Sequence, residues 1–231
     1  MTDFRSPADD ARRSFLARLA AGIAVAGGGL LAGARPAEAR AGASFQPARH
    51  AQDDWLDQVT GQHRFVFDTT NPEGFGTALL YANNFFNASQ SGYGLKDADT
   101  AVVVVARHNS TACAFGDAIW VKYGALLGSR IGLTDPRTKQ PPTVNLFNAR
   151  VTELPSRGTT IDSLVKRGAH LAVCQMATRF LAGLIAEATA GNAEAVYQEI
   201  AANLVGNAHL MAAGIVAVNR AQERGYTLAT A

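Results

Sequence analysis

The sequence predicts an α/β protein with a three-layer α/β/α architecture, in which helices cover both faces of a doubly wound, mostly parallel sheet. The first observation is an alternation of short β-branched or aromatic segments with longer segments of helical spacing, from residue 63 to the end of the chain. The second is the run of four valines at residues 102–105, which has no polar face. A strand that is apolar on both sides is typical of a parallel sheet buried between two layers of helices.

Three segments have the composition of strands, because they are short, β-branched or aromatic, and followed by turn or polar residues. They are His63–Thr69, Thr100–Ala106 and His170–Cys174. Helical spacing of apolar residues predicts the intervening helices. These are expected at residues 74–89, in a stretch that runs through Asp117 to about residue 127, and at residues 161–167, 177–190 and 193–204.

Two stretches are less regular. Residues 128–155 contain four prolines and no clear periodicity, which is typical of a functional loop or a subunit contact. Near the end, residues 209–218 are apolar and precede a polar turn. The pattern alone does not decide whether residues 215–224 form a closing helix and residues 226–228 a last short strand.

The first 39 residues have the order of a secretory signal: a basic pair, an apolar stretch and a small-residue cleavage site. The pair is Arg12 and Arg13, the uncharged stretch covers residues 20–34, and cleavage is expected after Ala39. The arginine pair indicates the twin-arginine route and a periplasmic location. The alternative is a membrane anchor, but the apolar stretch is shorter than the ~20 residues that span a bilayer. We therefore expect no stable membrane insertion after cleavage, a polar lead-in at residues 40–62 and an α/β domain at residues 63–231.

Composition excludes several classes of protein. Hydrophobic residues make up 48% of the 231 and charged residues 17%, which is too apolar for a disordered chain. A net charge of +2 without a basic run after the first forty residues argues against nucleic acid as a partner. Two cysteines cannot build a disulfide-rich scaffold or a four-thiolate metal site. No strand is followed by G-x-G-x-x-G or a P-loop, and no G-x-S-x-G occurs, so neither a nucleotide cofactor nor hydrolase chemistry is indicated.

Candidate binding residues follow the predicted strands, because ligands of doubly wound sheets bind beyond the carboxyl ends of the strands. Asp68 and Asn71 follow the first strand, and Arg107, His108 and Asn109 follow the second. Each also has a purely structural interpretation. Asp68 or Thr69 is expected to cap the next helix, and His108 to stabilise the turn after its strand.

The histidines do not predict a metal site. None of them forms an H-x-x-x-H or E-x-x-H pair, so ligation would need side chains that are distant in the sequence to converge. We therefore expect neither a metal nor a cofactor.

The two cysteines are the candidate reactive groups. Cys174 ends the third predicted strand just before a helix, where amide N–H groups and the helix dipole would lower the pKa of a thiol. Cys113 follows the valine strand in a similar way and is a candidate resolving thiol. Alternatively the two form a disulfide, or both are small buried hydrophobic residues without reactivity.

The order of elements resembles the DsrE/DsrF-like sulfur-relay family. The resemblance covers most of residues 63–228 and is carried by four segments of moderate specificity. They are FVFDTT…ALLYANNF from residue 65, VVVVARH from residue 102, LVKRGAHLAVCQMA from residue 164 and GIVAVNRAQERGY from residue 214. The signal, the segment 128–155 and the second cysteine depart from that family.

The resemblance implies that Cys174 carries sulfur as a persulfide, that the partner is a small sulfur-containing molecule or a protein thiol, and that the chain forms a homo-oligomer, a trimer or hexamer. The leading hypothesis is an exported DsrE-like protein that acts as a sulfur carrier or thiol-redox protein through Cys174. The alternative is a non-catalytic periplasmic module for ligand binding or oligomeric assembly.

Overall fold

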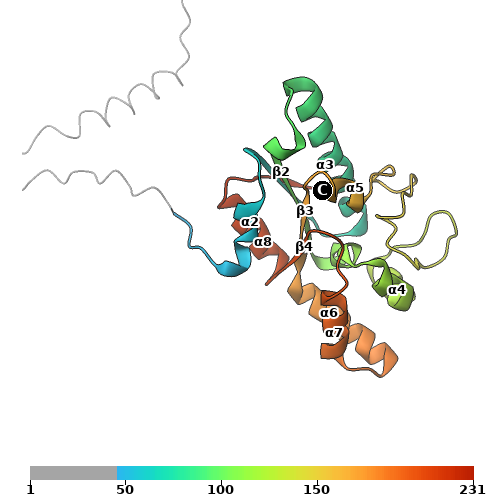
Figure 1. Ribbon diagram of the computed structural model, residues 1–231. Coiled ribbons are helices and arrows are strands. Elements are labelled where there is room, and N and C mark those ends of the chain that lie inside the picture. The colour runs from blue at the N-terminus through green and yellow to red at the C-terminus, as the bar shows by residue number, and fades with distance from the viewer. Residues whose placement is uncertain (1–45) are drawn as a thin grey trace, which may run out of the picture. The chain divides into compact units, whose positions relative to one another are not determined.

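A computed structural model describes residues 46–231 (Figure 1). The predicted signal, residues 1–39, and the start of the lead-in lie outside the described residues. Within the described part, no helix is both long enough and apolar enough to cross a membrane.

The centre of the described chain is a five-stranded sheet in which every neighbouring pair is parallel, in the order β4-β3-β2-β1-β5. The strands are β1 His63–Thr69, β2 Thr100–Ala106, β3 His170–Cys174, β4 Ala208–Met211 and β5 Thr227–Thr230. The first three have the predicted bounds. The fold class predicted from the alternation and the valine run is confirmed.

Helices connect the strands. The α-helices are α2 Trp55–Gln58, α3 Pro72–Tyr93, α4 Asp117–Ile131, α5 Ile161–Val165, α6 Gln175–Thr189, α7 Ala193–Ala201 and α8 Gly214–Gln222. Short 3-10 segments are η1 Ala51–Asp53, η2 Asp97–Asp99 and η3 His108–Ala114. The apolar stretch 209–218, which the sequence left open, is thus divided between β4 and α8.

Each face of the sheet has its own apolar core, and the valines of β2 alternate between them. Val102 and Val104 pack with side chains of α3, α4, α6 and α7. Val103 and Val105 pack with α2 and α8 on the other face. The four valines are all buried, as expected of a strand covered on both sides.

The order of the strands places a switch point between β3 and β4. After β3 the chain enters α6, whose Leu181 and Ile185 belong to the core of α3 and α4. After β4 it enters α8, whose Ala217 and Val218 belong to the opposite core. Adjacent strands whose connections leave on opposite faces open a crevice at their carboxyl ends, and this is where such folds bind ligands.

The segment between α4 and α5 contains turns but no strand, as predicted, although α4 includes the first four residues, 128–131, of the stretch expected to be irregular. Leu146, Phe147 and Val151 are buried in the core. Asn145 is also buried, and its amide nitrogen donates hydrogen bonds to the carbonyl oxygens of Cys113 (2.7 Å) and Phe115 (2.8 Å). The segment therefore covers η3.

Candidate functional site

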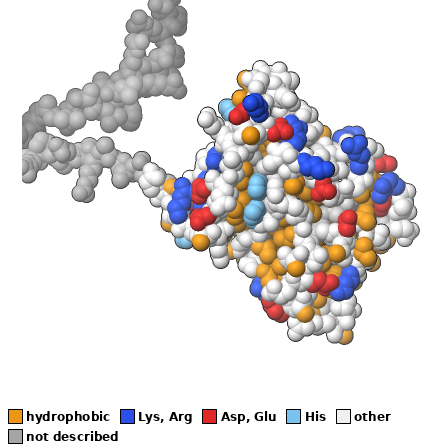
Figure 2. Space-filling model, in the orientation of Figure 1, with side chains coloured by type: hydrophobic (Ala, Val, Ile, Leu, Met, Phe, Trp, Pro, Cys, Tyr) orange, Lys and Arg blue, Asp and Glu red, His pale blue; other side chains and the backbone are white. Residues whose placement is uncertain are grey.

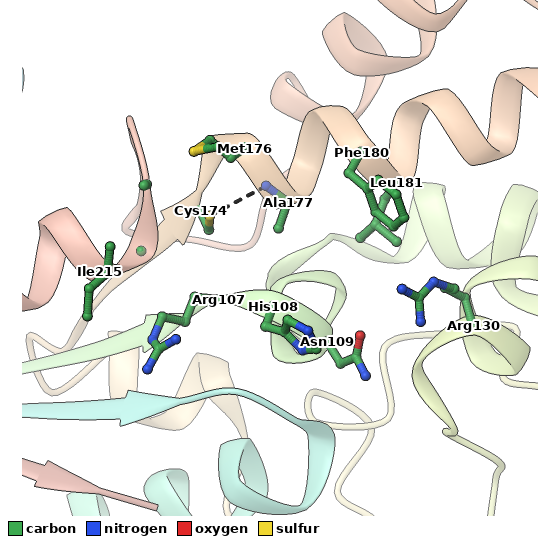
Figure 3. Close-up of a pocket in the computed structure, with 12 residues that line it drawn as sticks. Arg107, His108, Asn109, Arg130, Cys174, Met176, Ala177, Phe180, Leu181 and Ile215 are labelled. Atoms are coloured by element: carbon green, nitrogen blue, oxygen red, sulfur yellow. Dashed lines mark hydrogen bonds between the residues drawn. The ribbon is translucent and has the colours of Figure 1, made fainter.

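A cavity of about 430 Å³ lies at the switch point (Figure 3). Four chain segments line it: the turn after β2, the last turn of α4, the first turns of α6, and the start of α8. Its size falls in the range of small-molecule sites. The predicted ligand residues Arg107, His108 and Asn109 all line this cavity, together with Cys174.

Cys174 is the last residue of β3 and the N-cap of α6. Its Sγ accepts a hydrogen bond from the amide of Ala177 at 3.4 Å, drawn as the dashed line in Figure 3. The hydroxyl of Thr178 donates to the carbonyl oxygen of Cys174 at 2.9 Å and so fixes the cap. The thiol is 7% exposed and lines the cavity. The amide donor and the helix N-terminus both place positive electrostatic potential at this sulfur.

Arg107, which follows the neighbouring strand β2, supplies a fixed positive charge. Its Nε and Nη2 donate to the two carboxylate oxygens of Asp68 at 2.7 and 2.8 Å. The pKa of Arg107 is raised, chiefly by this hydrogen bond with Asp68 and further by Coulombic attraction to Asp68 and Cys174. Asp68 is buried and does not line the cavity, so it acts as a positioning residue for Arg107.

The turn after β2 is held by Ser110. Its Oγ accepts a hydrogen bond from the Arg107 amide at 3.0 Å and donates to the carbonyl oxygen of Thr69 at 2.9 Å. Within this turn His108 has a φ of 55°, which is uncommon outside glycine, and its side chain is exposed at the cavity. The geometry presents His108 and Asn109 to a ligand.

The start of α8 forms the side of the cavity that the sequence did not predict. The N-cap is Ala213, and no side chain caps α8. A helix start without a side-chain cap leaves amide N–H groups for an anion. Gly214 follows, and a Cβ there would overlap the Cβ of Arg107, so glycine lets α8 rest on the arginine stem.

The rim of the cavity is apolar and exposed. Met176 is 68% exposed, Phe180 53% and Ile215 59%. The guanidinium of Arg130, in the last turn of α4, lies over the Phe180 ring at 5.4 Å from its centroid. A thiol, two arginines and an apolar rim thus face one space.

Three predicted site residues do not line the cavity: Asp68, which holds Arg107, and also Asn71 and Cys113. Asn71 caps α3, with its Oδ1 accepting from the amide of Gly74 at 2.8 Å, which corrects the expectation that Asp68 or Thr69 is the cap. Cys113 is fully buried in η3, and burial raises the pKa of its thiol. Both cysteines are free, so the disulfide considered from the sequence is not formed.

Across residues 46–231, no three side chains drawn from His, Cys, Asp and Glu come together as a metal site. Neither a scan against protein-family models nor a search of curated proteins gives a match for this sequence, so the site is interpreted from its own geometry.

Proposed function

We propose that this protein carries sulfane sulfur on Cys174, taking it from a small persulfide or polysulfide and passing it to an acceptor thiol. The observation that carries the proposal is the Cys174 sulfur, which accepts an amide hydrogen bond at the start of α6 and lines an open cavity beside Arg107. The resemblance to DsrE/DsrF-like proteins supports the same role for this position.

The chemistry is an exchange without net oxidation. The Cys174 thiolate attacks the outer sulfur of a donor R–S–SH, so that a new S–S bond forms on Cys174 as the S–S bond of the donor breaks. The released R–S⁻ takes up the proton that Cys174 gave up, and the products are Cys174–S–SH and R–SH. Attack by an acceptor thiol R′–SH on the outer sulfur then gives R′–S–SH and restores Cys174.

Each step involves anions, and the site is built to hold them. The amide of Ala177 donates to the Cys174 sulfur, and Arg107 adds a positive charge that interacts with it. The uncapped start of α8 favours an anionic donor or leaving group at the other wall. We assign the role to Cys174 without a resolving thiol, because Cys113 is enclosed in the core.

Mass spectrometry after incubation with inorganic polysulfide tests the proposal. We expect a gain of one sulfur atom on the peptide that contains Cys174, reversed by dithiothreitol. The Cys113→Ser variant should gain the sulfur and Cys174→Ser should not. A folded wild-type protein that stays unmodified, or a Cys174→Ser variant that is modified equally, contradicts the role.

A second function, a non-catalytic binding or assembly module, is favoured by the exposed apolar rim of Met176, Phe180 and Ile215. In that case the cavity binds a ligand or a second copy of the chain while Cys174 stays unmodified. Light scattering of the mature protein checks the assembly: a trimer or hexamer that Phe180→Asp dissociates, with Cys174 unmodified by polysulfide, supports this function, and a monomer contradicts the assembly role of the rim.

We also propose export through the twin-arginine route. The substitutions Arg12→Lys and Arg13→Lys together should retain the protein in the cytoplasm, as measured by cell fractionation, and unchanged export would contradict this route.

A further inference from the structure

A second cluster of side chains, away from the cavity, joins the amino-terminal halves of β3 and β4 to α2. His170 begins β3 and His209 lies in β4, and the Nδ1 of His170 is 3.0 Å from the Nε2 of His209. Both imidazoles are half-buried. Figure 2 shows histidine side chains at the surface in the area where Figure 1 labels α2, β3 and β4.

Strand register brings these residues together. Leu171 pairs with Ala208 and Ala172 with His209, so His170 and His209 are diagonal neighbours on adjacent strands. Side chains alternate along a strand, so His209 and Met211 share one face of β4. Met211 belongs to the core on the α2 and α8 face.

Trp55 of α2 covers the cluster. Its ring stacks on His209 with centroids 4.0 Å apart and planes 4° apart, and it lies 5.9 Å from His170. The indole N–H points to the Sδ of Met211 at 3.3 Å. The indole thus contacts the imidazole and the thioether at once.

The donor atoms of this cluster are uncharged and soft. Two imidazole nitrogens face each other, and the thioether of Met211 lies two residues after His209 on the same face of β4, in contact with the Trp55 ring that stacks on His209. No hydrogen bond or ion pair in residues 46–231 joins an acidic side chain to either imidazole. Hard divalent cations need oxygen ligands, whereas thioether and imidazole together select Cu(I). An aromatic face beside the site favours a cation further.

We propose that His170, His209 and Met211 form a binding site for a soft monovalent d10 cation, Cu(I) or its analogue Ag(I), with Trp55 as its cover. Metal–imidazole bonds are about 2 Å long, so the two nitrogens need to separate by only a few tenths of an ångström to hold the ion between them. Half-exposure of both rings gives the ion a path from solvent. The site is independent of the sulfur-carrier function.

The test must separate this cluster from the thiol, because Cys174 is the register partner of Met211 and thiolates also bind Cu(I). The protein for titration is therefore the full mature chain with Cys174→Ser. We expect one equivalent of Ag(I), or of Cu(I) delivered anaerobically in competition with a chromogenic chelator. Binding should quench tryptophan fluorescence, and Trp120→Phe should retain the quenching because Trp55 is the reporter.

Variants assign the ligands. His170→Ala and His209→Ala should each weaken binding at least tenfold, and Met211→Leu should weaken it while preserving core volume. The matched control is His63→Ala, an exposed histidine that likewise begins a strand of this sheet, and it should bind normally. Circular dichroism confirms that each variant is folded.

X-ray absorption at the copper edge identifies the ligand atoms directly, independently of the measured affinity. We expect two nitrogen ligands and one sulfur ligand, with the sulfur lost in Met211→Leu. The proposal is overturned by no binding of Cu(I) or Ag(I), by undiminished binding in both histidine variants, or by Zn(II) binding more tightly than Cu(I).

Discussion

Cys113 and Cys174 follow consecutive strands of the same sheet, yet their surroundings differ in every respect that controls reactivity. Cys174 is the cap of a 15-residue helix and lines an open cavity. Cys113 has no exposed surface. It lies in the 3-10 segment η3, beneath the segment between α4 and α5. The carboxyl edge of a sheet is therefore not sufficient for a reactive thiol. The difference lies in where the next α-helix begins. Cys174 is itself the cap of that helix, whereas the chain after β2 first passes through the core, where Cys113 lies, before the next α-helix begins.

Alkylation rates should show the largest difference between the two cysteines. In the native protein, iodoacetamide should modify Cys174 roughly 100-fold or more faster than Cys113, because Cys113 reacts only through opening of the core, which costs at least a few kcal/mol. Peptide mass spectrometry over a time course measures both rates. Equal alkylation rates of Cys113 and Cys174 in the folded protein would contradict the difference in their surroundings. Denatured protein, in which the two rates should converge, is the control.

Stability should change more at Cys113 than at Cys174. Cys113→Ser places a hydroxyl group among apolar side chains, without a hydrogen-bond partner arranged for it. This should reduce the free energy of unfolding by about 1–3 kcal/mol. Cys174→Ser keeps a polar cap at the cavity and should cost less than about 1 kcal/mol. Urea unfolding of both variants measures these values, and the reverse order would show that the burial of Cys113 is wrong.

The alkaline side of the pH–stability profile should also depend on Cys113. Burial raises the pKa of this thiol above its ordinary value of 9.0, so in alkali the unfolded chain releases a proton that the folded chain keeps. The contribution of the Cys113 thiol to the free energy of unfolding is complete below pH 9. It is lost as the pH rises, with a slope of up to about 1.4 kcal/mol per pH unit. Cys113→Ala should therefore flatten the decline measured by urea unfolding above pH 9. An identical profile in wild type and Cys113→Ala would contradict this, and Cys174→Ala serves as the matched control.

The smallest effect is expected from the charge beside Cys174. Arg107→Met removes the positive charge that interacts with the Cys174 sulfur while keeping much of the stem, so the alkylation rate of Cys174 should fall about 3–10-fold near neutral pH. Arg107→Lys should restore part of the rate. A rate that does not change would mean that the amide of Ala177 alone activates the sulfur.

Sequence patterns predicted the regular part of the fold well, because β1, β2 and β3 are β-branched or aromatic runs with clear ends. They did not predict the α8 wall of the site. The apolar residues 209–218 are divided between the four-residue strand β4 and the start of the helix α8. Neither the two-residue period of a strand nor the 3.6-residue period of a helix therefore continues long enough to be recognised. The change from strand to helix is marked only by the small residues before Ile215.

Other features depend on tertiary contacts that no local pattern contains. The pairing of His170 with His209, 39 positions apart in the sequence, follows from strand register. The depth of Cys113 is set by Asn145, whose amide reaches the Cys113 carbonyl from a segment without periodicity. By contrast, the approach of Arg107 to Cys174 was predictable, because neighbouring parallel strands end at the same edge.

Gly214 has a mechanical consequence. Since the first turn of α8 rests directly on the stem of Arg107, that helix cannot shift without disturbing a guanidinium clamped to Asp68. Asp68 in turn is paired with Thr230, and its carbonyl oxygen accepts from the amide of Ala231. Through Arg107 and Asp68 the start of α8 is therefore connected to the last residues of the chain on β5, which lies at the opposite edge of the sheet from β4.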